Sequence, residues 1–228
     1  MQNKIEPIHV ARADEDLPPQ PPEFVQTLFF WAALTTLGLF AFNLYYRVLL
    51  ANRLTAALSA PPGPAASLAL LLVLLPAGVA QGFILGLAQW YVLRRAVKSD
   101  YRWIALTILG WTLSYGLYLG YVSAGGFSQT VDVLGDSGSL LPFEILRGLV
   151  VGACQWLALR AWGRPTWLWI GVVIVAQIVN LSVSRWLSDL PVAPAIGWVA
   201  NGLVTGAGMV FLLRACWAGL VARGQVVE

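Results

Sequence analysis

Charged residues are scarce in this sequence: Asp, Glu, Lys and Arg make up 11% of 228 residues, whereas 58% are apolar. A soluble domain carries about 25% charged residues, so this composition is typical of an integral membrane protein. It also excludes intrinsic disorder, collagen and coiled coils. The net charge is only +3 and the basic residues are scattered, so we expect no nucleic-acid partner.

Side chains that bind metal or haem are nearly missing as well. The chain has one histidine, two cysteines and two methionines. His9 lies in a polar N-terminal tail, and Cys154 and Cys216 lie in apolar runs without a Cys or His partner. We therefore expect no metal site, no haem and no disulfide scaffold. A bound lipid, carotenoid or chlorophyll is left open, because Gln or Asn can ligate chlorophyll.

No hydrolase, zinc-protease or nucleotide-binding motif occurs in the sequence. The apolar runs also lack a ladder of Asp, Glu or His, which a proton-driven transporter usually carries. We therefore expect a protein without enzymatic activity.

Six apolar runs are long enough to cross roughly 30 Å of hydrocarbon as helices. They cover residues 24–46, 65–93, 103–123, 141–162, 167–183 and 192–213. The sequence thus predicts an all-α transmembrane domain over residues 24–217. A polar, proline-rich tail (1–23) precedes it, a short tail (218–228) follows it, and residues 124–140 form its longest loop.

The basic residues predict how the helices are inserted. If both termini are cytoplasmic, ten Lys and Arg residues lie on that side and four on the other. This asymmetry follows the positive-inside rule. We therefore expect a multi-pass protein of a bacterial inner or photosynthetic membrane, in contact with membrane lipids, with both termini in the cytoplasm.

An internal repeat is the most specific pattern in the chain. Residues 82–94 read GFILGLAQWYVLR, residues 148–160 GLVVGACQWLALR and residues 202–214 GLVTGAGMVFLLR. A weaker repeat starts at Trp31 (WAALTTLG) and Trp103 (WIALTILG), with a faint third copy at Trp169. These copies predict three two-helix units inserted in the same direction. Such parallel repeats are related by an axis along the membrane normal, so we expect a pseudo-threefold bundle.

The motif GxxxGxxQWxxLR, followed by a Trp-led helix, resembles a broad group of uncharacterised bacterial multipass membrane proteins, some from photosynthetic bacteria. The resemblance covers roughly residues 65–217. It implies a shared helical bundle but no agreed activity, so it assigns no catalytic residue. Together with the small size and the lack of catalytic motifs, it favours a structural or accessory subunit of a larger photosynthetic or bioenergetic complex, bound to other membrane-protein subunits.

The glycines and the glutamine of the motif share one helix face, where close backbone approach and hydrogen bonds can join helices in lipid. The predicted packing residues are Gly82, Gly86, Gln89, Gly148, Gly152, Gln155, Gly202 and Gly206. Alternatively, the glutamines line a central cavity. Tryptophans and arginines near the helix ends are typical interface anchors. The predicted anchors are Trp90, Arg94, Trp103, Trp156, Arg160 and Arg214.

The position before each first glycine is polar: Gln81, Arg147 and Asn201. Helix rise places these residues about 20 Å from the arginines that end the motif. A charge at that depth needs a partner, and Glu144 is one helical turn away from Arg147. Two interpretations stay open: the residues face inward as a site for an anionic or hydrogen-bonding group, or Arg147 pairs with Glu144 and extends outward.

Two other functions follow from these alternatives. An inward-facing site would make the protein a small transporter or ligand-binding bundle. A third possibility is a carrier of a pigment, quinone or lipid.

Overall fold

The computed structural model describes residues 23–50, 52, 64–123 and 141–226. Its long helices are α1 (Phe24–Tyr45), α3 (Pro64–Ala96), α4 (Arg102–Ser123), α6 (Leu141–Leu159), α7 (Leu168–Trp186) and α8 (Ala193–Ala222). A π-helical turn, η1 (Tyr46–Leu50), extends α1, and two 3-10 turns, η2 (Arg160–Trp162) and η3 (Arg164–Trp167), connect α6 to α7. The predicted loop 124–140 and nearly all of the predicted tail 1–23, with His9, lie outside the described residues.

Six helices are long and apolar enough to cross a membrane, with candidate spans of 19 to 30 residues. Within the described ranges no β-strand occurs, and only an isolated bridge joins Val97 to Val226. The prediction of an all-α chain with six membrane-length helices is therefore confirmed, and the chain is compatible with a multi-pass membrane protein.

The last helix is longer than the predicted span 192–213, and it includes part of the predicted tail 218–228. Helix α8 continues to Ala222, and its Cys216 and Leu220 are buried. Arg214 is exposed, so its charge does not interrupt the helix. Gly224 then reverses the chain with φ 61°, and Val226 is buried where it pairs with Val97. The described C-terminal residues therefore pack onto the bundle.

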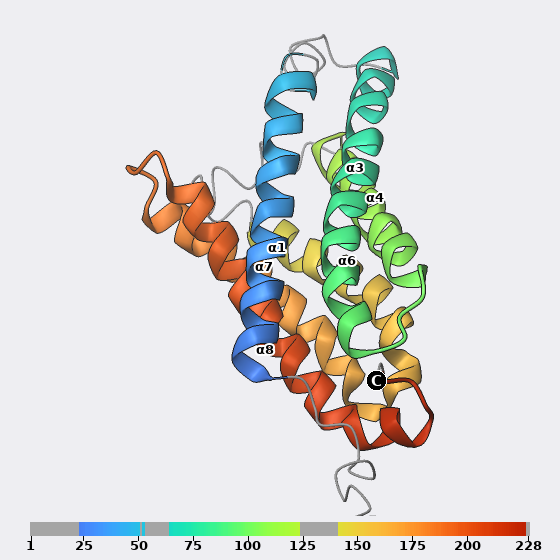
Figure 1. Ribbon diagram of the computed structural model, residues 1–228. Helices are drawn as coiled ribbons and strands as arrows, with labels where there is room; N and C mark the ends of the chain where they lie inside the picture. Colours follow the sequence, from blue (N-terminus) through green and yellow to red (C-terminus); the bar gives the residue numbers. More distant parts are fainter. Residues whose placement is uncertain (1–22, 51, 53–63, 124–140, 227–228) are drawn as a thin grey trace, which may run out of the picture.

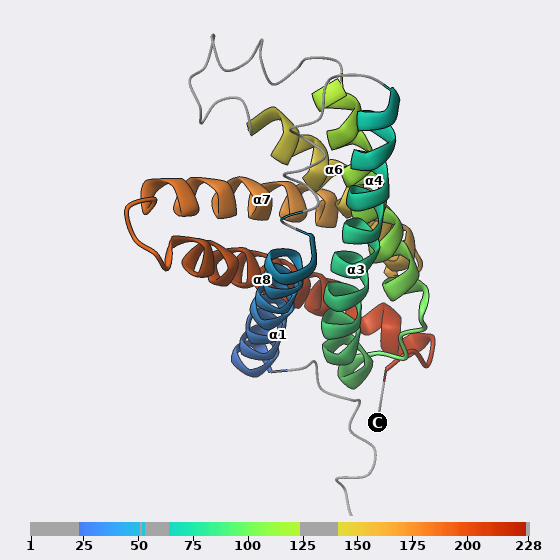
Figure 2. The same cartoon turned by 90° about the horizontal axis from the view of Figure 1, so that it is seen from above.

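The helices form a ring in the order α1, α3, α4, α6, α7, α8, which closes where α8 packs on α1 (Figure 1). Neighbours in the ring run in opposite directions. We call the end of the bundle where α1 begins and α8 ends the terminal end, and the opposite end, where α7 turns into α8, the loop end. Figure 2 shows that α7 and α8 are strongly tilted against α1 and α3.

The bundle has an apolar core, as a soluble protein does, but its outer surface is apolar as well. Large apolar residues cover the outside, for example Phe29, Leu72 and Phe211, which are 70%, 64% and 58% exposed. Polar side chains are buried instead, among them Thr35, Gln81, Gln89, Thr107, Gln155, Gln177, Asn201 and Thr205. Because polar groups in lipid-embedded helices face the bundle interior, this arrangement places the candidate site on the axis of the ring.

Candidate functional site

The first glycine of each repeated motif lies against the backbone of one neighbouring helix. A Cβ added to Gly82 would lie 2.5 Å from the Cα of Ile108 on α4, one on Gly148 2.6 Å from the Cα of Ile174 on α7, and one on Gly202 2.8 Å from the carbonyl oxygen of Ala32 on α1. The second glycines, Gly86, Gly152 and Gly206, face the same three neighbours. The helices of each pair are thus close enough for short polar side chains to reach across.

Three tryptophans from three of the helices meet within the ring. The ring centroids of Trp31 and Trp103 are 6.1 Å apart, and Trp169 lies 5.9 Å from each of them. All three side chains are at most 1% exposed. This position differs from the expectation that Trp103 anchors the protein at the lipid interface. The repeat contained the signal, because the three tryptophans start its three aligned copies.

The other predicted anchors lie near the terminal end. Trp90 is partly buried, and its indole N–H donates to the Ser99 carbonyl oxygen over 3.2 Å. The guanidinium of Arg94 lies 4.9 Å from the centre of that ring. Trp156 is partly buried, and Arg160 and Arg214 are exposed.

A hydrogen-bonded group that we call the glutamine network surrounds Gln155. Its side-chain amide donates to Gln89 Oε1 (3.2 Å) and Thr107 Oγ1 (3.1 Å), and its carbonyl oxygen accepts from Trp169 Nε1 (3.0 Å). Gln155 on α6 is thereby bonded to α3, α4 and α7. In the third copy of the motif Met209 replaces the glutamine, and Thr205 Oγ1 accepts from the indole N–H of Trp31 over 3.1 Å instead.

A cavity of about 220 Å³ lies inside the ring, and all six long helices contribute to its wall. The glutamine network and Trp169 form part of the wall, so Gln89 and Gln155 both join helices and line the cavity. Three residues of the predicted polar site, Gln81, Arg147 and Asn201, also line it.

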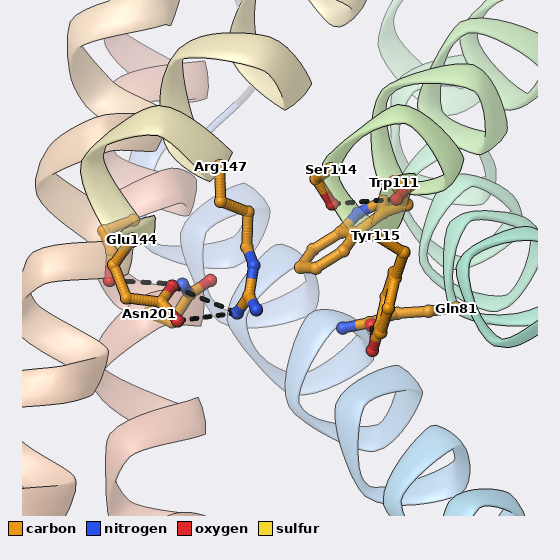
Figure 3. A network of polar contacts seen from close by, with 8 residues as sticks. Gln81, Trp111, Ser114, Tyr115, Glu144, Arg147 and Asn201 are labelled. Atoms are coloured by element: carbon orange, nitrogen blue, oxygen red, sulfur yellow. Dashed lines mark hydrogen bonds and ion pairs between the residues drawn. The ribbon is translucent and has the colours of Figure 1, made fainter. Parts of the chain in front are cut away.

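Figure 3 shows how these polar residues lie. Arg147 Nη1 contacts both carboxylate oxygens of Glu144, at 2.8 and 3.0 Å. Tyr115 Oη donates to Gln81 Oε1 over 2.8 Å, and Asn201 Nδ2 donates to the Ala176 carbonyl oxygen over 3.2 Å. Glu144 does not line the cavity. Arg147 therefore makes the expected ion pair and still lines the cavity.

Three buried polar atoms of cavity-lining residues have no hydrogen-bond partner among the described residues: Thr35 Oγ1, Arg147 Nε and Asn180 Oδ1. They come from α1, α6 and α7. A buried donor or acceptor left unsatisfied costs about 1–3 kcal/mol, so such atoms mark positions where a ligand or water completes the bonding.

Thr35 and Asn180 were missed by sequence reasoning. Thr35 stands four residues after the first repeated tryptophan, at the position of Thr107 in the second copy, which is a weak signal. Asn180 lies on α7 one turn after Gln177, another lining residue, and this i, i+3 spacing puts both on one helix face.

The described part of the chain holds no group of three or more His, Cys, Asp or Glu side chains arranged to bind a metal ion. What the cavity wall offers is amide and hydroxyl groups together with one guanidinium. This set suits hydrogen bonding to a small polar molecule.

Comparison with protein-family models, curated proteins and solved structures found no match. Functional inference therefore rests on the side chains of the cavity.

Proposed function

We propose that this protein is a ligand-binding membrane bundle, or small transporter, for a compact polar solute that occupies the central cavity. The observation that carries the proposal is that three residues lining one cavity, on three helices, each have a buried polar atom without a partner among the described residues. A purely structural bundle gains nothing from leaving such atoms unsatisfied, because each one lowers its stability.

The polar atoms of the cavity-lining side chains also indicate which class of solute would bind. Glu144 occupies Nη1 of Arg147, and Nε of the same guanidinium has no partner in the part of the chain that the structure describes. An acceptor oxygen of the solute, from a carboxylate or an amide, suits this nitrogen and the Thr35 hydroxyl. Asn180 Oδ1 needs a donor instead. A cavity of about 220 Å³ has the volume of about seven waters. The favoured solute is therefore a small molecule with both an acceptor oxygen and an N–H or O–H group.

The architecture we propose is three repeated units about one axis, each made of a glycine-bearing helix and the helix it packs against: α3 with α4, α6 with α7, and α8 with α1. The glycine contacts and the mutual packing of Trp31, Trp103 and Trp169 support it. These tryptophans lie in the halves of α1, α4 and α7 that are nearer the terminal end. In this proposal they close the axis toward the terminal end, and the solute enters from the loop end.

The positive-inside asymmetry supports cytoplasmic termini, which would make the loop end the external face. On this assignment the cavity receives its solute from outside the cell. The resemblance of the sequence to bacterial multipass membrane proteins supports a bacterial inner or photosynthetic membrane as the location of the protein. It assigns no activity.

An accessory subunit of a larger membrane complex is the second candidate. The tip of the α7–α8 hairpin supports it, because Trp186, Leu190 and Val192 are 86%, 47% and 53% exposed there. These side chains could contact another membrane protein. We rank this role second because it does not require unpartnered polar atoms around a cavity.

The test uses the purified protein in nanodiscs and a panel of amino acids, hydroxy acids, amides and polyols. We expect one class to raise Tm, as any ligand that binds only the folded state does. In the double variant Glu144→Gln/Arg147→Gln that shift should be lost. Removing both charges together avoids leaving one of them buried and unpaired.

The single variant Glu144→Gln is the control: it leaves Arg147 without its counter-ion and should lower Tm, but it keeps the guanidinium and should still respond to the solute. A double variant that responds like the wild type would contradict the proposal. A protein that is isolated only in stoichiometric complex with another subunit, and responds to no solute, would favour the accessory role.

A further inference from the structure

A second, larger cleft of about 720 Å³ lies at the terminal end. Its walls come from the end of α3 and the segment after it, the start of α4, the end of α6 with η2, and Gln225 of the C-terminal segment. It shares no lining residue with the central cavity, so what it binds is independent of the function proposed above.

The cleft is lined by more positive than negative charge. Three cationic residues, Lys98, Arg102 and Arg160, stand against one acid, Asp100. Arg102 Nε lies 3.2 Å from Asp100 Oδ2, but both side chains are more than half exposed, at 82% and 61%. An ion pair this exposed is weak and easily exchanged for another anion. Arg160 forms no ion pair within the described residues.

One residue of the cleft wall, Trp103, has a buried hydrogen-bond donor without a partner among the described residues. Trp103 is 1% exposed, and its indole Nε1 has no partner among the described residues. The equivalent indoles do have partners, since Trp31 donates to Thr205 and Trp169 to Gln155. A ligand with an acceptor atom would provide a hydrogen-bond partner for the indole N–H of Trp103.

The rest of the wall is apolar. Leu93, Leu106, Leu157 and Ala158 line the cleft, and Leu157 is 41% exposed on the outer surface of α6. The cleft therefore joins a basic polar rim to a surface suited to hydrocarbon. In a six-span protein the helix ends lie at the level of the lipid headgroups.

We propose that this cleft binds the phosphate headgroup of an anionic phospholipid. The phosphate lies among Lys98, Arg102 and Arg160, an ester carbonyl oxygen accepts from Trp103 Nε1, and an acyl chain follows Leu106 and Leu157. Basic pockets between membrane helices on the cytoplasmic side bind such headgroups. The apolar wall favours a lipid over a free phosphate ion, which would leave that wall exposed.

The experiment measures lipid retention by native mass spectrometry of the full chain, released from nanodiscs of phosphatidylcholine mixed with phosphatidylglycerol. The wild type should retain phosphatidylglycerol selectively. Lys98→Gln and Arg160→Gln should each weaken retention about fivefold, the usual strength of one basic residue at an anionic membrane surface. Arg95→Gln is the matched control, because Arg95 is an exposed cation at the same end of α3 that does not line the cleft.

Trp103→Phe removes the indole donor together with part of a buried ring system, so Trp169→Phe, which loses the same ring volume, is its control. Because Trp103 Nε1 has no partner to lose among the described residues, Tm in phosphatidylcholine alone should fall only by the cost of the lost volume, and by less than in Trp169→Phe. Retention of phosphatidylglycerol should fall. This combination distinguishes a binding role from a structural one.

Glycerol 3-phosphate and inorganic phosphate serve as probes of the headgroup alone. Equal retention of the two lipids, or equal losses in Arg95→Gln and Arg160→Gln, would overturn the proposal. Tight binding of inorganic phosphate without selective lipid retention would overturn it too, and would identify a soluble phosphate as the ligand.

Discussion

Two polar regions lie within the ring of helices, and they differ in how their hydrogen bonds are completed. In the glutamine network, Gln155 bonds to Gln89, Thr107 and Trp169 from three other helices. Elsewhere in the wall of the cavity, Thr35 Oγ1 and Asn180 Oδ1 are buried without partners among the described residues. The network completes its bonds within the protein and joins helices, whereas the bonds of Thr35 and Asn180 are the ones that we propose a solute completes.

The clearest instance of this difference is a pair of threonines at matching positions of the repeat. Thr107 is 0% exposed, accepts a hydrogen bond from Gln155 and donates one to the Trp103 carbonyl oxygen over 2.7 Å. Thr35 is 2% exposed, and its hydroxyl has no partner among the described residues. The same residue type thus has two hydrogen-bond partners in one copy of the repeat and none among the described residues in the other.

The largest effect is expected from removing the centre of the glutamine network. Gln155→Leu loses three interhelical hydrogen bonds and leaves the Trp169 indole without an acceptor. At the strength measured for such bonds in other membrane proteins, the variant should lose about 2 kcal/mol of unfolding free energy. Unfolding in mixed micelles of increasing denaturing detergent measures this loss.

Gln177→Leu is the matched control, because Gln177 lines the cavity and its side chain has no hydrogen bond within the described residues. It should cost far less than Gln155→Leu. Equal losses for the two variants would remove the distinction between the two regions.

A smaller effect is expected from the hydrogen bond of one indole N–H, taken as the difference between two Trp→Phe variants that lose the same buried ring volume. Trp169→Phe also deletes the donor to Gln155 and should cost about 1 kcal/mol more than Trp103→Phe. Trp103→Phe removes an N–H without a partner among the described residues, so in a bilayer without anionic lipid it should lose only the ring packing. The same detergent titration compares the two, and a larger loss for Trp103→Phe would contradict the assigned bonds.

The smallest change concerns the two threonines. Thr107→Val deletes a hydroxyl with two partners and should cost about 1 kcal/mol. Thr35→Val replaces an unsatisfied hydroxyl by a methyl group of the same size and should be neutral or slightly stabilising. Thermal unfolding in nanodiscs without added solute measures which of the two variants has the higher Tm. The reverse order would mean that Thr35 has a partner in the folded protein.

The sequence predicts much of the helical framework from simple physical signals. Six charge-poor runs give the helices, and Gly82, Gly148 and Gly202 do lie at close backbone contacts. The predicted end at residue 213 does not match α8, because an exposed Arg214 stops an apolar run without stopping a helix. Hydropathy therefore locates the spans better than their ends.

The candidate site is only partly predictable. Gln81, Arg147 and Asn201 stand out because polar groups are costly at membrane depth, and all three line the cavity. Thr35 gives no such signal, since a threonine in an apolar helix can bond to its own backbone, as Thr107 does. The neighbouring Arg102 made Trp103 look like an interface residue, and only tertiary packing places its ring between two other tryptophans.

The most direct test of the cavity as a binding site measures the solute-induced rise in Tm of Thr35→Val and Thr107→Val side by side in nanodiscs. Our account predicts that Thr35→Val keeps the Tm of the wild type but loses the response to the solute. Thr107→Val should have a lower Tm and keep the response. A Thr35→Val variant that responds to the solute as fully as the wild type would contradict the account.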